Sequence, residues 1–411
     1  MRFKNKYSLI IVCLTILFNY GYSQNNLNYN DVLGQNPNNR INTITTAVPF
    51  LIIAPDARAG ALGDAGVASK PDANSMHWNP AKYAFIENDM GFSMSYSPWL
   101  RALVNDINLA YLTGYKRIDK QQTVAASLLF FSLGDITFTN DIGQVIGDFK
   151  PNEFSIDVAY SRLFSEEISG AVAMRYIYSN LTGGIFVGGA ESRAGQSIAA
   201  DVSAFYRKPL EIKSTDAILS VGVNVSNIGQ KISYTENIET DFIPINLRLG
   251  PSLSLELDKY NQLSFMFDIN KLLVPTPPIW KLDTNGLPVY GPDGKREILL
   301  GRDPNVSVVS GMFGSFNDAP GGFKEEMREF TLSTGAEYWY DKQFAIRAGY
   351  FYEHATKGNR KYFTLGAGLK YNVFGLDFAY LIPTEQRNPL ENTLRFTLTF
   401  DFSAFKEQSK L

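Results

Sequence analysis

From residue 90 onward, hydrophobic and polar residues alternate along short segments of the chain. In the first segment Phe92, Met94 and Tyr96 alternate with small residues, and the period of two returns in the segments that follow. Because successive side chains of a β-strand point to opposite faces, this period predicts strands with two different faces. We count fourteen such segments, each near the roughly 9–11 residues that a tilted strand needs to cross a bilayer.

Two kinds of β-protein could explain segments with one apolar and one polar face. Phe265 and Leu398 belong to apolar faces, whereas Asp157 and Arg347 alternate with them on polar faces. A soluble β-sandwich also alternates. However, Tyr and Phe recur at the segment ends, as in the aromatic girdles of membrane barrels, and the gaps alternate between long and short. We therefore predict an all-β fold, a 14-stranded antiparallel transmembrane β-barrel over residues 90–402, multi-pass in the cell outer membrane.

The segments outside the predicted barrel have their own compositions. Residues 1–23 combine a basic start, a short apolar run and small residues before Gln24, which is typical of a secretory signal peptide. We expect residues 24–89 to form a leader and then a plug in the barrel lumen, with a C-terminal tail at 403–411. An even number of strands would place both ends of the barrel on the periplasmic side.

The expected plug is rich in Ala, Gly, Asp and Pro, and its glycines permit tight turns and close approach to the barrel wall. Its charged residues could gate a solute path or contact an arriving protein, but we favour salt bridges to the wall. We expect His77 to anchor a turn. The plug candidates are Asp56, Arg58, Asp64, His77, Trp78 and Asn79.

Apolar residues gather in two of the expected outer loops. The longer loop, residues 272–328, exceeds what a connection needs. Large apolar side chains there either pack as a lid over the lumen or bind a partner protein, and both hold if the lid opens on binding. The partner-binding candidates are Trp99, Leu100, Leu103, Leu273, Val274, Ile279, Trp280, Met312, Phe313 and Phe316.

Composition limits the chemistry that this chain can perform. A formal net charge of -3 gives no basic footprint for nucleic acid. After the signal peptide only His77 and His354 remain as histidines and there is no Cys, so a His/Cys zinc site is excluded. His354 lacks a Ser partner in any local motif. We expect no enzyme activity, no catalytic residues, no metal and no cofactor.

Four short blocks of the plug segment resemble a known family. They are residues 55–60, 63–68, 72–74 and 77–81, which read PDARAG, GDAGVA, DAN and HWNPA. This pattern is similar to the N-terminal signature of the PorV family, outer-membrane barrels of the type IX secretion system. That family is distantly related to the FadL-type barrels, which also have fourteen strands and an N-terminal hatch.

The resemblance implies a role in protein transport. Family members bind substrates carrying a C-terminal signal domain as these leave the translocon, and shuttle them to the cell-surface attachment complex. The implied partners are a large outer-membrane translocon protein, this cargo and the sortase-like attachment complex, beside outer-membrane lipid and without nucleic acid. The alternative from another class is a FadL-like transporter of hydrophobic small molecules, for which a strand kink at Gly250-Pro251 is the one hint.

Overall fold

A computed structural model describes residues 40–402, apart from 102, 103, 105, 140, 141, 185, 188, 189, 236–239, 386 and 387. The expected signal peptide, most of the leader, Leu103 and the C-terminal tail lie outside the described residues. Contacts divide the chain into two units, residues 1–40 and residues 41–411, and the description below concerns the second unit.

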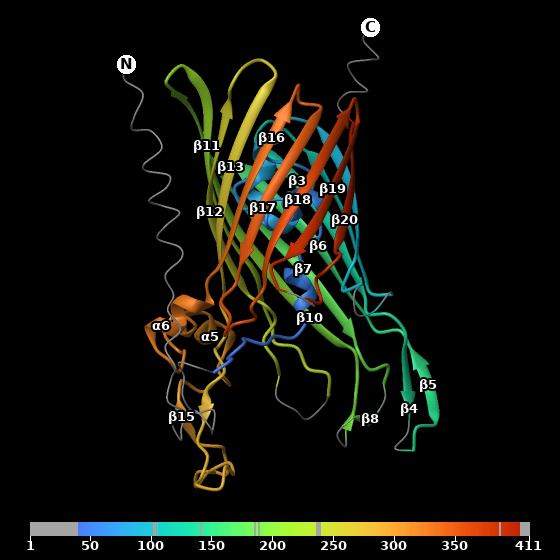
Figure 1. Cartoon of the computed structure of the whole chain (residues 1–411), viewed down its shortest axis with the longest axis vertical. Helices are drawn as coiled ribbons and strands as arrows, with labels where there is room; N and C mark the ends of the chain where they lie inside the picture. Colours follow the sequence, from blue (N-terminus) through green and yellow to red (C-terminus); the bar gives the residue numbers. More distant parts are fainter. Residues whose placement is uncertain are drawn as a thin grey trace. The chain divides into compact units, whose positions relative to one another are not determined.

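Fourteen strands form one closed barrel in which every neighbouring pair is antiparallel (Figure 1). The first strand pairs with the last, so the ring has no free edge. This confirms the predicted architecture. The barrel strands are β1 (Met90–Pro98), β2 (Asn108–Arg117), β3 (Gln122–Ser132), β6 (Asn152–Leu163), β7 (Ile168–Asn180), β10 (Gly195–Ile212), β11 (Thr215–Gly229), β12 (Asn246–Glu256), β13 (Asn261–Leu272), β16 (Thr331–Tyr340), β17 (Phe344–Tyr352), β18 (Lys361–Tyr371), β19 (Phe374–Pro383) and β20 (Leu394–Asp401).

The two faces of each strand differ in the way that the sequence period predicts. In β3, Val124, Leu128 and Phe130 point outward and are exposed, whereas Ser127 and Leu129 point inward and are buried. An apolar outer face on a ring without edges suits the hydrocarbon of a bilayer, where unpaired backbone groups are costly. Among the described helices, none combines the length and hydrophobicity that a membrane span requires.

Short turns lie at one end of the barrel and long loops at the other (Figure 1). The sequence pattern predicts a gap at residues 208–216, but β10 and β11 continue until only Lys213 and Ser214 separate them. Both of these residues have positive φ, 48° and 68°, as a two-residue hairpin turn requires. The ladder runs beyond the apolar pattern because backbone pairing does not depend on which side chains face the bilayer.

The long-loop end carries small elements of its own. Two-stranded sheets are formed by β4 (Ile136–Thr139) with β5 (Val145–Phe149), by β8 (Phe186–Val187) with β9 (Ala190–Glu191), and by β14 (Ile279–Trp280) with β15 (Ile298–Leu300). The loop between β13 and β16 also holds α5 (Val308–Gly314), α6 (Phe323–Glu326) and the 3₁₀ turn η4 (Met327–Glu329). The sequence pattern predicts only a long loop here, because these helices are too short to show a period.

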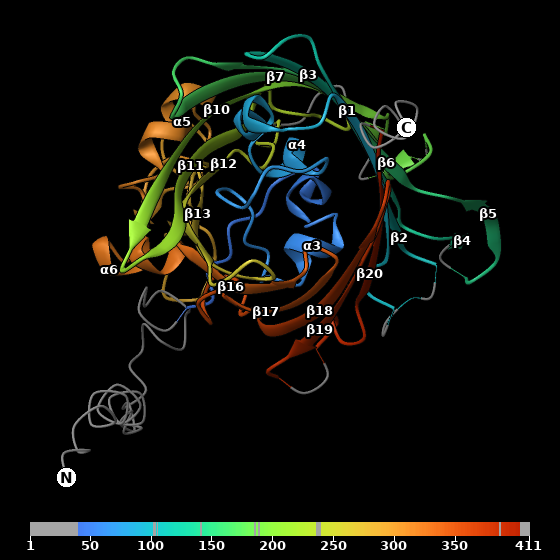
Figure 2. The same cartoon turned by 90° about the horizontal axis from the view of Figure 1, so that it is seen from above.

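The N-terminal segment fills the inside of the ring, as Figure 2 shows for α3 and α4. Its elements are η2 (Pro49–Ile52), α3 (Ala57–Gly60), α4 (Ser75–Trp78) and η3 (Pro80–Phe85). Helix α3 contacts β18, β19 and β20, while η3 contacts β6, β7 and β10 on another side of the wall. At one contact a Cβ added to the wall residue Gly349 would lie 2.1 Å from the Gly63 nitrogen. Glycine therefore permits the close seating of the plug that the sequence predicts.

Candidate functional site

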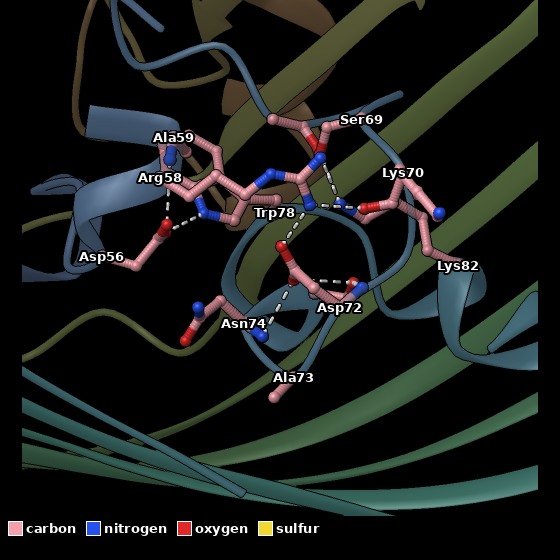
Figure 3. Close-up of polar contacts among 12 residues, drawn as sticks. Asp56, Arg58, Ala59, Ser69, Lys70, Asp72, Ala73, Asn74, Trp78 and Lys82 are labelled. Carbon is pink, nitrogen blue, oxygen red and sulfur yellow. Dashed lines mark hydrogen bonds and ion pairs between the residues drawn. The ribbon is translucent and has the colours of Figure 1, made fainter. Parts of the chain in front are cut away.

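Helix α3 of the plug begins at a buried carboxylate. The Asp56 side chain accepts a hydrogen bond from the Ala59 backbone nitrogen (2.9 Å), which caps the helix, and another from the Trp78 indole (2.6 Å; Figure 3). An N-cap acceptor satisfies one of the free N–H groups of the first turn. Asp56 thus ties two parts of the plug together and makes no ion pair with the wall in the described residues.

Arg58 joins the plug to the barrel wall. Its guanidinium pairs with Asp72 of the plug (2.7 Å) and with Glu337 of β16 (2.8 Å). Glu337 in turn pairs with Arg347 of β17 (2.6 Å), and Arg347 with Asp377 of β19 (2.7 Å). Because these charges are largely buried, each depends on its partners, and the chain of ion pairs locks plug and wall together.

Asp64 makes a second attachment to the wall. Its carboxylate accepts hydrogen bonds from Arg395 of β20 (2.8 Å) and from the hydroxyl of Tyr362 in β18 (2.5 Å). Asp64 has positive φ, as does the preceding Gly63, so the chain turns sharply here. A side chain on Gly63 would meet the Tyr350 backbone, which makes glycine necessary at this turn.

Residues 77–79 form the packed middle of the plug. Trp78 is buried, the Arg248 guanidinium lies 4.4 Å from the centre of its ring, and the His77 ring contacts its edge. Asn79 caps η3 by accepting from Ala81, and its amide nitrogen donates to backbone carbonyls of the plug and of β10. All six plug candidates thus lie in the lumen, and Arg58 and Asp64 form ion pairs with the wall.

Several of the partner-binding candidates are buried inside a lid at the long-loop end. Leu273 and Val274 belong to one apolar cluster with Phe50 of the plug, and Ile279 is also buried. Trp99 and Leu100 are half-buried against neighbouring clusters. These residues therefore pack into the interior at the long-loop end and offer little surface to a partner.

Trp280 and Met312 are half-buried as well. The Arg296 guanidinium lies 5.1 Å from the centre of the Trp280 ring, and Met312 packs against the cluster that holds Leu273. Helix α5 thus turns Met312 toward the lid. The next residue, Phe313, points away from it and is 75% exposed.

Phe313 belongs to a group of exposed apolar side chains on α5, α6 and the segments beside them. We call this group the outer apolar face; its members are Val309, Phe313, Phe316, Phe323 and Met327. Phe323 is 80% exposed. Phe313 and Phe316 are among the candidates predicted from the sequence, and the other three are not, because nothing in a loop without a period indicates which side chains face outward. Exposed apolar patches of this kind mark interaction surfaces.

A buried charge cluster fixes the segment that carries this face. Lys271 at the end of β13 pairs with Glu326 (3.2 Å) and Glu329 (2.6 Å), and Lys357, between β17 and β18, pairs with Glu325 (2.7 Å) and Glu329 (2.9 Å). We call these five residues the lid clamp. They hold α6 and η4 against the rim of the barrel, and Met312 holds α5 through its packing against the cluster of Leu273, so the outer apolar face is presented from a fixed position.

Asp318 lies beside the lid clamp. Its backbone nitrogen donates to Glu326 (2.7 Å), and its carboxylate accepts from the Thr276 nitrogen (3.2 Å). Burial, together with the negative charges of Glu326 and Glu329, raises the pKa of Asp318 to about 6. The lid therefore contains a carboxyl group whose charge changes at mildly acidic pH.

The described residues contain no group of three or more His, Cys, Asp or Glu that could hold a metal ion. The ring nitrogen Nδ1 of His354 lies 3.0 Å from the Thr356 hydroxyl, two residues along the same loop. That contact is local and brings together no nucleophile, base and third orienting group.

Comparison with known proteins identifies a family for this chain. The family model described as "Type IX secretion system protein PorV" matches residues 35–279, more than half of the sequence. No curated protein matches the chain.

The solved structures that are similar to this chain include a toluene transporter, a monoaromatic hydrocarbon channel and a FadL homologue. The toluene transporter TodX of Pseudomonas putida has a TM-score of 0.47 and 11% identity, over 88% of this chain and 98% of its own. The monoaromatic hydrocarbon channel CymD has a TM-score of 0.47 and 13% identity, over 85% and 98%. A FadL homologue of Pseudomonas aeruginosa has a TM-score of 0.43 and 10% identity, over 88% and 99%.

Proposed function

The chain belongs to the PorV family of the type IX secretion system, and we propose that it binds secreted cargo at its outer apolar face. It is an outer-membrane β-barrel. In this proposal, cargo carrying a C-terminal signal domain is received as it leaves the translocon and is carried to the cell-surface attachment complex. The protein acts by binding and release and performs no covalent chemistry.

The observation that carries the proposal is the exposure of large apolar side chains on a rigid support. Phe313 and Phe323 are the most exposed members of the outer apolar face, and aromatic side chains contribute most to binding when a partner covers them. The lid clamp holds α6, and the packing of Met312 against the cluster of Leu273 holds α5, so little conformational entropy is lost on binding. A soluble cargo domain could reach this surface from the outer side without entering the lumen.

The interior of the barrel favours the proposed binding of cargo over the transport of small molecules. The alternative, a FadL-like transporter, needs an apolar path through the lumen or a gap in the wall. The β12–β13 ladder is interrupted at Gly250 and Pro251. The interruption faces the plug, however, because Asp268 opposite accepts hydrogen bonds from the Gly66 and Val67 nitrogens (2.7 and 2.9 Å). This irregular stretch of the wall therefore contacts and supports the plug.

The experiment replaces two exposed aromatics with acidic residues. We expect the amount of cargo that co-purifies with the double variant Phe313→Asp/Phe323→Asp to be at least about tenfold lower than with the wild-type protein. The reason is that a charge on each side chain opposes desolvation. Heat-modifiable migration on gels checks that the barrel is folded. Both side chains are largely exposed, so the substitutions leave the core unchanged.

The matched control is Leu287→Asp, an exposed apolar residue of the same loop outside α5 and α6. This control should retain cargo. Undiminished cargo binding by the double variant, or an equal loss in the control, would show that the outer apolar face is not the binding site.

A further inference from the structure

A cavity of about 350 Å³ opens at the short-turn end of the barrel, beneath the plug. In bacterial outer-membrane barrels this end faces the periplasm. Its walls come from the plug, through Arg58, Lys70 and Asp72, and from the ends of several strands, through residues such as Trp339 and Arg347. We call it the periplasmic vestibule. Its volume is at the lower end of the range for small-ligand pockets.

Positive charge exceeds negative charge in the lining of the vestibule. Six basic residues face four acidic ones; they are Arg58, Lys70, Arg207, Lys342, Arg347 and Lys370 against Asp72, Glu87, Asp377 and Asp401. Ion pairs join Arg58 to Asp72, Arg347 to Asp377 and Lys370 to Asp401. Lys70 and Lys342 form no ion pair with the described residues, and both are exposed at the vestibule.

One donor in the wall is buried without a partner. The Arg347 side chain is fully buried and uses Nε and Nη1 on Glu337 and Asp377. Its Nη2 has no hydrogen-bond partner among the described residues. A buried guanidinium nitrogen left unpaired is costly, and a negative charge in the vestibule that Arg347 lines would reduce this cost.

The charges around Lys70 agree with the binding of an anion. Its recessed position and the positive charges of Arg58 and Lys370 lower the pKa of Lys70, although Glu87 favours the charged form. A bound anion would offset the repulsion among these cations. Apolar and aromatic side chains line the rest of the vestibule, including Tyr115, Trp339 and Phe400, and they reduce the screening of charges by water.

We propose that the periplasmic vestibule is a binding site for a carboxylate or phosphate group, held by Lys70 and Lys342 beside the unpaired Arg347 donor. The group could belong to a free small anion or to an acidic segment of a periplasmic protein. This site lies at the opposite end of the barrel from the outer apolar face, so it is independent of the proposed cargo binding.

The test is calorimetric titration of the whole purified protein in detergent. The probes are inorganic phosphate and an acidic peptide of alternating Asp and Glu, each at matched ionic strength. We expect saturable binding of at least one probe, and at least a tenfold loss of affinity in the variant Lys70→Gln/Lys342→Gln. The control Lys120→Gln removes an exposed lysine from a turn at the same end, outside the vestibule, and should bind as the wild type does.

The fluorescence of Trp339 supplies a second readout, because this ring lines the vestibule. A ligand-dependent change that disappears in Trp339→Phe places the bound probe there. Tighter binding of the peptide identifies a protein segment as the source of the anion, and tighter binding of phosphate identifies a free anion. The proposal is overturned if neither probe saturates, or if Lys70→Gln/Lys342→Gln binds with unchanged affinity.

Discussion

At Glu337 two guanidinium groups meet one buried carboxylate. Arg58 comes from the plug and Arg347 from the wall, and both lie within 3 Å of the Glu337 oxygens. Each guanidinium also pairs with a second carboxylate, Arg58 with Asp72 and Arg347 with Asp377, and Glu337 joins the two. The attachment of the plug therefore depends on this one acidic residue more than on any surface pair.

We expect Glu337→Ala to destabilise the folded protein by about 3–5 kcal/mol, since it breaks two buried ion pairs and leaves three guanidinium donors of Arg58 and Arg347 without an acceptor. The measurement is urea unfolding in detergent, followed by heat-modifiable migration. Glu297→Ala is the control, because it removes one partner of the exposed Lys281–Glu297 pair, and such pairs contribute about 0–1 kcal/mol. Equal effects of the two substitutions would show that the buried network does not hold the plug.

The partners of single plug residues could not be predicted from the sequence. The sequence suggests that Arg58 and Asp64 form salt bridges to the wall. It cannot name Glu337 or Arg395 as their partners, which lie about 280 and 330 positions along the chain. Pairing across such distances depends on the register of every strand between them. A single sequence does not indicate which distant residues make those contacts.

Among the elements, the strands were the most predictable part of the molecule. Each crosses a bilayer with alternating faces, so its period is imposed over the length that faces the bilayer, and all fourteen predicted strands are confirmed. The elements of the long loop are different. Leu273 and Phe313 are both large and apolar in the sequence, yet the first is buried and the second is exposed. A loop without a period gives no signal that separates the two.

The lid formed by this loop should become more stable as the pH falls toward 5. The pKa of Asp318 is raised to about 6, so the protonated form is favoured in the closed lid. The stabilisation is complete below pH 3.8 and is lost as pH rises through 6. Burial raises the pKa of Glu325, but hydrogen bonds from Lys357 and Asn42 outweigh burial and lower it. Glu325 therefore stays charged in this window.

Hydrogen exchange of residues 308–329, corrected for the intrinsic rate, measures the opening of the lid. We expect opening to be about tenfold rarer at pH 5 than at pH 7.5. Asp318→Asn mimics the protonated group, so it should remove the pH difference and keep the lid closed at both values. A pH difference that survives in Asp318→Asn would assign the effect to another group.

At the scale of the whole molecule, the two ends of the barrel differ in chemistry. The long-loop end combines an apolar lid with the outer apolar face, whereas the short-turn end opens into the basic periplasmic vestibule. The plug between them is fixed by buried ion pairs to the wall. A barrel arranged in this way separates its two surfaces, so each can bind its own partner.

Site-specific photocrosslinking in cells tests most directly whether cargo is received at the outer apolar face. Benzoylphenylalanine in place of Phe313 should form a covalent adduct with the C-terminal signal domain of secreted cargo. The same group in place of Val158, an exposed residue of the strand β6 on the bilayer side, should form none. Adducts absent at position 313, or equally abundant at position 158, would contradict the account.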